Sequence, residues 1–202
     1  MIEIKVSEIF TSFQGEGPYI GTPATFLRLY GCNLNCEWCD TDISTYEMLS
    51  VDDVAEILMT QMEFNNINLL VITGGEPTLQ MEEIKRLIKE LPEDIKIQLE
   101  TNGSIFEYLP EIEYVISPKE DKEKVFENYH KYDNVFFKFV ITSKEDIDEV
   151  IAIKNKYGYD KTIWLQGEFS KDALMVDLIR ENFPRLENIK LSVQTHKYLS
   201  QR

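Results

Sequence analysis

Short apolar runs alternate with amphipathic helical stretches along most of this 202-residue chain. The clearest unit starts with a helix cap at Ser50, continues with apolar residues at helical spacing up to Met62, and ends in the apolar run 69–73. Such alternation favours a parallel sheet that is covered by helices and wound by right-handed crossovers. Other strands are expected over 2–10, 24–29, 95–100, 135–141, 162–166 and 189–193, and other helices around Ile84 and from Ser143 to Tyr157.

The length of the chain limits the kind of barrel that it can form. A complete eight-unit β/α barrel takes about 250 residues, so 202 residues predict an α/β fold with a partial, TIM-like barrel of parallel strands. Its 43% hydrophobic content suffices for one core, and we expect a single domain over residues 1–202. Active-site residues of barrels gather at the carboxyl ends of the strands. The polar segments expected there are the cysteine loop, 73–76, 100–103, 117–119 and Gln166.

All the cysteines of the chain, Cys32, Cys36 and Cys39, lie in one loop after an early predicted strand. Three thiolates can bind three irons of a 4Fe-4S cluster, and the fourth iron then stays open to another ligand. Zinc is an alternative, although zinc sites usually add a fourth Cys or His. The only histidines, His130 and His196, lie far along the chain. Redox-active thiols are a third alternative, and the spacing favours the open cluster.

The net charge of the chain limits the classes of molecule that it can bind. A formal net charge of −15 argues against nucleic acid, which requires a basic surface, so we expect a small-molecule substrate. We expect no membrane span, because no apolar stretch is long enough, and no signal peptide at the N-terminus. Clustered thiols stay reduced in the cytoplasm, where we expect the protein to act. The charged run 119–124 is typical of a solvated helical face.

The cysteine loop resembles the signature of the radical S-adenosylmethionine superfamily, Cys-x3-Cys-x2-Cys with an aromatic residue, here Trp38, before the last cysteine. The resemblance implies that the open iron binds S-adenosylmethionine, whose sulfonium bond is broken by an electron from the cluster to give a radical. A second element is Thr73-Gly74-Gly75-Glu76-Pro77. Its glycines allow close approach to a ligand, and Glu76 offers an acceptor for the methionyl ammonium. Taken alone, this turn is more typical of an ordinary strand-to-helix connection that binds no ligand.

The segment Glu8-Ile9-Phe10-Thr11-Ser12-Phe13-Gln14-Gly15-Glu16-Gly17 resembles the opening of the 7-carboxy-7-deazaguanine synthase family. The likeness continues to the end of the chain, through Gly21-Thr22-Pro23-Ala24, Phe26-Leu27-Arg28, Gly31-Cys32-Asn33-Leu34, Cys39-Asp40-Thr41, Ser117-Pro118-Lys119 and Gln194-Thr195-His196-Lys197.

The family resemblance implies a carbon–nitrogen lyase. It would rearrange 6-carboxy-5,6,7,8-tetrahydropterin to 7-carboxy-7-deazaguanine with loss of ammonia, a step towards queuosine and related deazapurines. The radical would take a hydrogen atom from C6 and return it afterwards, so that S-adenosylmethionine is regenerated. Magnesium would bind through Thr41 and the substrate carboxylate, since a hard dication prefers oxygen ligands. The resemblance further implies a homodimer, and an electron donor that the sequence does not identify.

The resemblance also implies roles for individual residues. The catalytic set consists of Cys32, Cys36 and Cys39, which hold the cluster, together with Arg28 and Glu16. Arg28 can pair with a carboxylate in bidentate fashion, and the alternative for it is an ordinary ion pair. The residues expected to contact the pterin are Phe13, Gln14, Gly15, Glu16, Arg28, Thr73, Glu100, His196 and Arg202. The residues expected to contact S-adenosylmethionine are Trp38, Cys39, Asp40, Gly74, Gly75, Glu76, Ser117, Pro118, Lys119 and Gln166.

Two other functions stay open at this point. Activases that place a glycyl radical on a protein share the cysteine spacing and the glycine turn, although Gln14 and Glu16 speak against them. A binding or electron-transfer protein with a structural metal is the more distant alternative. The chain also departs from the family after Gln166, where Gly167-Glu168-Phe169 replaces a Pro-Met-like continuation. The C-terminal segment from Gln194 shows no helical pattern, and the segment 42–49 has no assigned role.

Overall fold

The computed structural model describes residues 2–39, 41–42, 44–168 and 172–199. The strands are β1 (Glu3–Phe13), β2 (Pro23–Leu29), β3 (Glu47–Ser50), β4 (Leu69–Gly74), β5 (Lys96–Thr101), β6 (Glu113–Ile116), β7 (Val135–Ile141), β8 (Ile163–Gly167) and β9 (Ile189–Ser192). The α-helices are α1 (Val51–Asn65), α2 (Met81–Glu90), α3 (Lys122–Tyr129), α4 (Lys144–Lys156), α5 (Asp172–Glu181) and α6 (Thr195–Tyr198), and short 3-10 helices are η1 (Gly17–Tyr19), η2 (Pro77–Gln80) and η4 (Phe183–Arg185).

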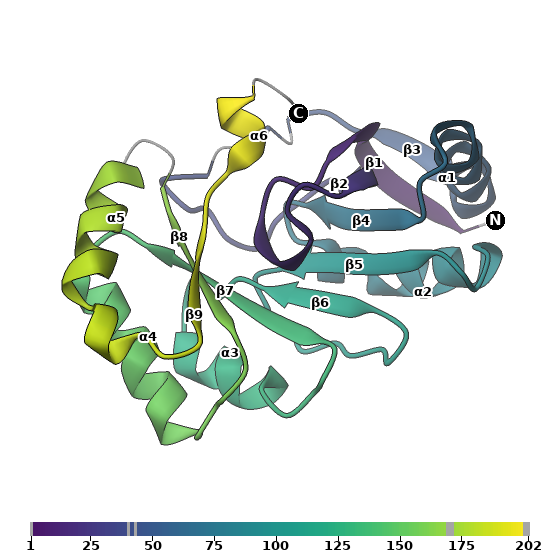
Figure 1. The fold of residues 1–202 in the computed structure, drawn as a ribbon. Helices are drawn as coiled ribbons and strands as arrows, with labels where there is room; N and C mark the ends of the chain where they lie inside the picture. The colour runs from purple at the N-terminus through teal and green to yellow at the C-terminus, as the bar shows by residue number, and fades with distance from the viewer. Residues whose placement is uncertain (1, 40, 43, 169–171, 200–202) are drawn as a thin grey trace.

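The strands form one curved sheet in the order β3-β1-β2-β4-β5-β6-β7-β8-β9. Helices α1 to α5 lie along its convex side, and β9 ends at an open edge (Figure 1). Pairing is parallel from β2 through β4 to β9. The predicted partial barrel of parallel strands is therefore confirmed for this part of the sheet.

The parallel prediction is wrong for the first strands, because β1 pairs antiparallel with both β2 and β3. The chain turns back between Phe13 and Pro23, so β1 and β2 form a hairpin with a long loop. After the cysteine loop, β3 returns to the outer edge of the sheet. Part of the segment 42–49 therefore forms an edge strand, which the sequence analysis did not predict.

The predicted helix starts agree with the observed caps. The hydroxyl of Ser50 accepts a hydrogen bond from the Asp53 amide at 3.0 Å, and Ser143 forms a capping box with Asp146. The charged run 119–124 is only partly helical, because α3 begins at Lys122. The C-terminal prediction was also wrong, since Thr195–Tyr198 form the short helix α6. Its first amide is held by the Gly15 carbonyl at 3.1 Å, a tertiary contact that no local pattern reveals.

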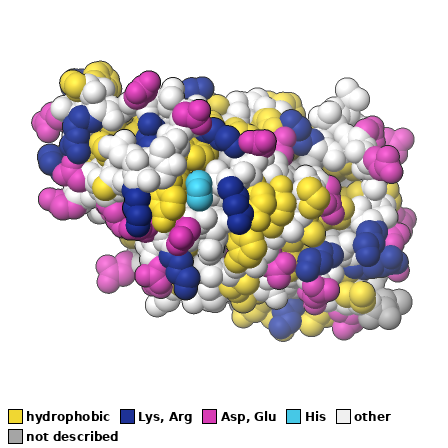
Figure 2. Space-filling model, turned by 90° about the horizontal axis from the view of Figure 1, so that it is seen from below, with side chains coloured by type: hydrophobic (Ala, Val, Ile, Leu, Met, Phe, Trp, Pro, Cys, Tyr) yellow, Lys and Arg dark blue, Asp and Glu magenta, His cyan; other side chains and the backbone are white. Residues whose placement is uncertain are grey.

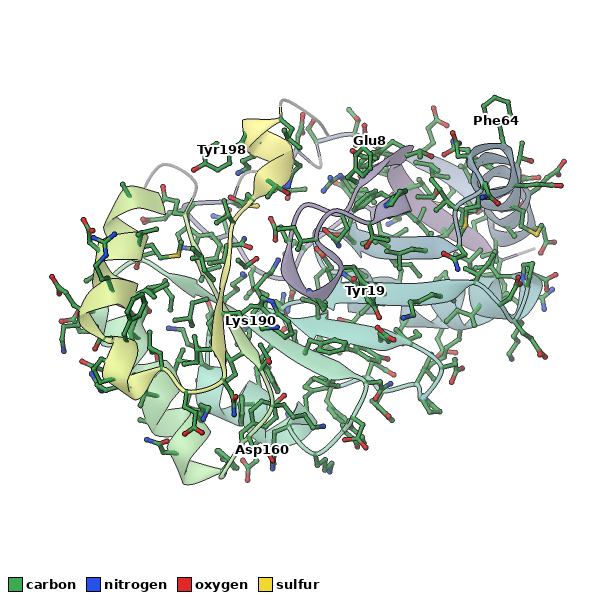
Figure 3. The ribbon with its side chains drawn as sticks, in the orientation of Figure 1. Glu8, Tyr19, Phe64, Asp160, Lys190 and Tyr198 are labelled. Carbon is green, nitrogen blue, oxygen red and sulfur yellow. The ribbon has the colours of Figure 1, made fainter. Side chains whose placement is uncertain are left out.

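Two apolar layers define the inside of the fold. The main core lies between the sheet and its helices, and a smaller cluster around Phe10 and Phe26 lies on the opposite face of the sheet. These two rings stack with centroids 4.9 Å apart. At the amino ends of β5 and β6, Tyr19 bonds to Lys96 and Glu113 and covers that end of the barrel (Figure 3). The interior consequently opens at the carboxyl ends of the strands.

Over the face in Figure 2, acidic and basic side chains are interspersed rather than gathered by sign. Within the described residues, we find no helix with the length and apolar character needed to cross a membrane.

Candidate active site

A cavity of about 960 Å³ opens at the carboxyl ends of the strands, between the cysteine loop, the β1–β2 loop and α6. It brings together most of the residues that the sequence singled out: Phe13, Gln14, Gly15, Glu16, Arg28, Cys32, Cys36, Trp38, Cys39, Thr41, Thr73, Gly74, Gly75, Glu100, Ser117, Lys119, Gln166 and His196. Glu76 and Pro118 are buried beside it and do not line it. Asp40 and Arg202 lie outside the described residues.

The three cysteines are free thiols at one wall of this cavity. Burial raises the pKa of the Cys36 thiol, and the nearby Lys119 charge opposes that effect. Within the described ranges, no three Cys, His, Asp or Glu side chains converge on one metal ion. A 4Fe-4S cluster does not require such convergence, because each thiolate binds a different iron. Three thiols on one exposed loop fit the cluster that the spacing predicts.

The glycine pair packs the β4 turn against the start of the cysteine loop. Gly74 has φ +144, and a β-carbon there would lie 2.6 Å from the Leu29 backbone nitrogen. A β-carbon on Gly75 would lie 2.9 Å from that of Cys32. Glu76 then donates its amide to the Gly31 carbonyl at 2.7 Å. Glycine is required here for close packing of two backbones, and both glycines also face the cavity.

The carboxylate of Glu76 binds other parts of the protein. It is completely buried and accepts hydrogen bonds from the Thr78 amide and hydroxyl, the Thr101 hydroxyl and the Asn102 amide, all within 3.0 Å. In this structure the carboxylate is thus engaged within the protein, and its expected role toward a ligand ammonium stays a prediction. Asn102 continues the connection, because its side-chain amide donates to Asn33 in the cysteine loop at 3.0 Å. Glu76 thus ties the ends of β4 and β5 to that loop.

Lys119 contacts the cysteine loop from the end of β6. Its ammonium donates to the Ser117 hydroxyl at 2.6 Å and lies 4.8 Å from the centroid of the Trp38 ring. Burial and the charge of Lys138 lower the pKa of Lys119 to about 8. Contrary to the expectation for the run 119–124, this lysine lines the cavity.

A polar network from the β1–β2 loop lies along another wall. The amide of Gln14 donates to the Glu100 carboxylate at 2.9 Å, and the Gln14 carbonyl oxygen accepts from the Glu16 backbone at 3.1 Å. Thr73 donates to the other oxygen of Glu100 at 3.5 Å. Strands β4 and β5 and the β1–β2 loop therefore place carboxylate and amide oxygens side by side.

Glu16 is bound by two residues that sequence analysis missed as site residues. Lys138 on β7 donates to one carboxylate oxygen, and Gln194 donates to the other at 2.7 Å. Burial alone would raise the pKa of Glu16, but the Lys138 charge and these hydrogen bonds lower it below its ordinary value. The single signal for Lys138 was a lysine within the apolar run of β7.

Arg28 lies on β2 with its guanidinium near Phe10 and Glu8. Its Nε is 3.5 Å from a Glu8 oxygen, and its Cζ is 5.7 Å from the Phe10 ring centroid. The ion pair that sequence analysis kept as an alternative is therefore present. Arg28 also lines the cavity, where its role toward a ligand carboxylate stays a prediction.

Comparison with known proteins agrees with this architecture. Residues 27–115 match the family model described as the Radical SAM superfamily. The chain is 34% identical to the 7-carboxy-7-deazaguanine synthase of Rickettsia prowazekii, over 98% of this chain and 88% of that protein. It is 33% identical to the synthase of Hyperthermus butylicus, over 79% and 74% of the two chains.

This chain belongs to the 7-carboxy-7-deazaguanine synthase family. The fold of the family is also found in the crystal structure of QueE from Escherichia coli, which superposes with a TM-score of 0.72 and 23% identity over 95% of this chain and 94% of that one. Membership makes the chain a radical S-adenosylmethionine lyase that uses a 4Fe-4S cluster and S-adenosylmethionine. This membership sets the zinc and activase alternatives aside.

Proposed function

We propose that this synthase family member converts 6-carboxy-5,6,7,8-tetrahydropterin to 7-carboxy-7-deazaguanine, with loss of ammonia, in the synthesis of queuosine or a related deazapurine. The observation that carries the proposal is the row of acceptors formed by Gln14, Glu16 and Glu100, in the same cavity as the three thiols. The guanidine and amide edge of a pterin presents N–H donors, which match carboxylate and amide oxygens. The similarity of the chain to two 7-carboxy-7-deazaguanine synthases supports the same reaction.

The chain's own residues divide the cavity between cofactor and substrate. Cys32, Cys36 and Cys39 would hold the cluster. S-adenosylmethionine would lie against Trp38, Asp40, the glycine turn, Ser117-Pro118-Lys119 and Gln166. When bound, the cluster supplies the electron that cleaves S-adenosylmethionine, and the cleaved cofactor removes a hydrogen atom from the substrate. The protein's contribution is to bind and orient the pterin so that C6 faces that side of the cavity.

The substrate carboxylate has two proposed partners at the cavity wall. Arg28 would form a bidentate pair with it, which requires its guanidinium to exchange part of its contact with Glu8. Thr41, which lines the cavity, would hold a magnesium ion that also binds this carboxylate. His196, Phe13, Gly15 and Thr73 line the same cavity and would complete the pterin site, with Arg202 from the C-terminal end.

The proposed chemistry also bears on the cellular location and the partners of the enzyme. Free clustered thiols need a reducing compartment, which supports a cytoplasmic location. Reductive cleavage needs an external electron donor. A homodimer rests on the family resemblance.

The test is anaerobic reconstitution followed by assay. The reconstituted protein should contain one 4Fe-4S cluster whose spectrum changes when S-adenosylmethionine is added, and it should convert the carboxypterin to the carboxydeazaguanine. Cys36→Ala should abolish both the intact cluster and turnover. Full activity of an iron-free zinc form would contradict the cluster, and an intact cluster without turnover of the carboxypterin would contradict the substrate.

A further inference from the structure

Lys138 is a charged residue in a strand that is otherwise built from apolar residues. Strand β7 reads Val-Phe-Phe-Lys-Phe-Val-Ile, and the Lys138 side chain is only 7% exposed. Burying an ammonium costs free energy unless it is paired. Its partner is Glu16, whose side chain is 12% exposed, and both residues line the cavity.

The contacts of Glu16 hold its carboxylate from two sides. Lys138 donates to Oε2 from β7, and Gln194 donates to Oε1 from the segment between β9 and α6. Each carboxylate oxygen can accept two hydrogen bonds. A ligand in the cavity can therefore reach Glu16 only as a donor, provided that the carboxylate stays ionised.

Two other residues near Glu16 also favour its ionised form, and one opposes it. His196 and Lys119 face it from α6 and from the end of β6, and each interacts favourably with its negative charge. The opposing charge is Glu100 on β5, whose carboxylate is separated from Glu16 by the Gln14 side chain. Lys138 is the one among these that bonds directly to the carboxylate in the described part of the chain.

We propose that Lys138 is a positioning residue that determines specificity: it keeps Glu16 as an oriented hydrogen-bond acceptor, so that the cavity selects a ring that presents N–H donors. The inference rests on the proposed function for the identity of that ring, a pterin. The contact between Lys138 and Glu16 is independent of the proposed function. A methionine at position 138 keeps most of the length of the side chain, being one atom shorter, and removes its charge and donors.

The experiment uses reconstituted holoenzyme as wild type, Lys138→Met, Glu16→Gln and the double variant. Isotope-edited infrared spectra, with Glu16→Gln as the reference, report protonation of the Glu16 carboxyl as the pH is lowered from about 8 to about 5. Binding of 6-carboxypterin is compared with binding of 6-carboxylumazine, in which a carbonyl replaces the exocyclic amine. Lys144→Met is the matched control, because it removes an exposed lysine from its pair with Asp148.

We expect Glu16 to stay ionised over this pH range in wild type and to begin to take up a proton within it in Lys138→Met, because burial then acts without the opposing Lys138 charge. We expect the same variant to reduce the preference for the pterin over the lumazine about tenfold, with the cluster content unchanged. The double variant should discriminate no worse than Glu16→Gln alone, since both changes remove the same acceptor. A Glu16 carboxyl that stays ionised down to about pH 5 in Lys138→Met, or losses that add in the double variant, would overturn the proposal. If wild type binds neither ring, the pterin proposal fails, while the infrared titration still decides whether Lys138 controls Glu16.

Discussion

A β-carbon built on Gly15 would lie 2.8 Å from Cγ of His196 and 2.9 Å from its Cβ. The His196 side chain therefore occupies the space that any side chain at position 15 would need. The same two segments are joined by the Thr195 amide and hydroxyl, which both donate to the Gly15 carbonyl at 3.1 Å. The position of α6 over the cavity thus depends on a glycine in the β1–β2 loop.

We predict that Gly15→Ala displaces His196 and raises KM for the carboxypterin roughly tenfold, which corresponds to about 1.4 kcal/mol of lost binding. Cluster content and the response to S-adenosylmethionine should stay as in wild type. His196→Gly provides the matched background, because it removes the overlapping side chain. If Gly15→Ala is equally harmful in that background, the overlap with His196 is not the cause.

Glu76→Gln should destabilise the protein by about 3 kcal/mol, because a charged acceptor with several buried donors is lost. The glutamine oxygen can replace Oε1, which receives Thr78 and Thr101, but its amino group would then face the Asn102 amide, a second donor. Urea denaturation of the apoprotein measures the change in the free energy of unfolding. Glu82→Gln, which alters an exposed pair with Lys85, should change it by about 0.5 kcal/mol or less.

The helices and parallel strands were predictable where the pattern was long and local. Strand β7 and helices α1 and α4 have continuous apolar runs or helical spacing with recognisable caps. Strands β3 and β6 were not predicted, because strands of four residues give little periodic signal. The antiparallel direction of β1 depends on where the β1–β2 loop sends the chain, and this is a property of the whole fold.

The candidate site was predictable where residues belong to motifs, and incompletely where they act through remote partners. The cysteines, Gln14 and Glu16 were found because their spacing is characteristic. Lys138 was missed because one lysine in an apolar strand forms no motif. The burial of the Glu76 carboxylate was not predictable, since it is decided by Thr101 and Asn102, which lie on another strand and its following loop.

Arg28→Lys should lower kcat/KM about tenfold or more, equivalent to about 1.4 kcal/mol of transition-state stabilisation. A lysine keeps the charge but cannot form two parallel bonds to one carboxylate. Arg180→Lys is the control, because Arg180 is 65% exposed and pairs with Asp177, and neither residue has a proposed role in the site. Glu8→Gln, which removes only the resident ion-pair partner, should have the smaller effect. Unchanged kinetics in Arg28→Lys would remove this residue from the substrate site.

Lys119 should release its proton near pH 8 in the apoprotein, because burial and the neighbouring Lys138 charge lower its pKa to about 8. The unfolded chain keeps this proton up to about pH 10.4. Between these values the unfolded state binds more protons, so the contribution of Lys119 to stability rises with pH. NMR titration of 13C-methylated lysines, assigned with Lys119→Met, gives the midpoint directly. A midpoint equal to that of the exposed lysines would contradict the prediction.

Deleting residues 197–202 tests the C-terminal segment. The truncated chain keeps Gln194 and its bond to Glu16, and it keeps Thr195 and His196, but it loses Lys197, which lines the cavity. It also loses the Leu199 amide, which donates to the Thr195 carbonyl at 3.0 Å and closes the turn of α6. We expect intact cluster and S-adenosylmethionine binding together with a roughly tenfold loss in kcat/KM for the carboxypterin.

A shorter deletion, of residues 200–202, removes Arg202 and keeps the residues that close the turn of α6. Loss of the cluster in the longer deletion would assign the segment a structural role, and wild-type constants in both deletions would remove Arg202 from the pterin site.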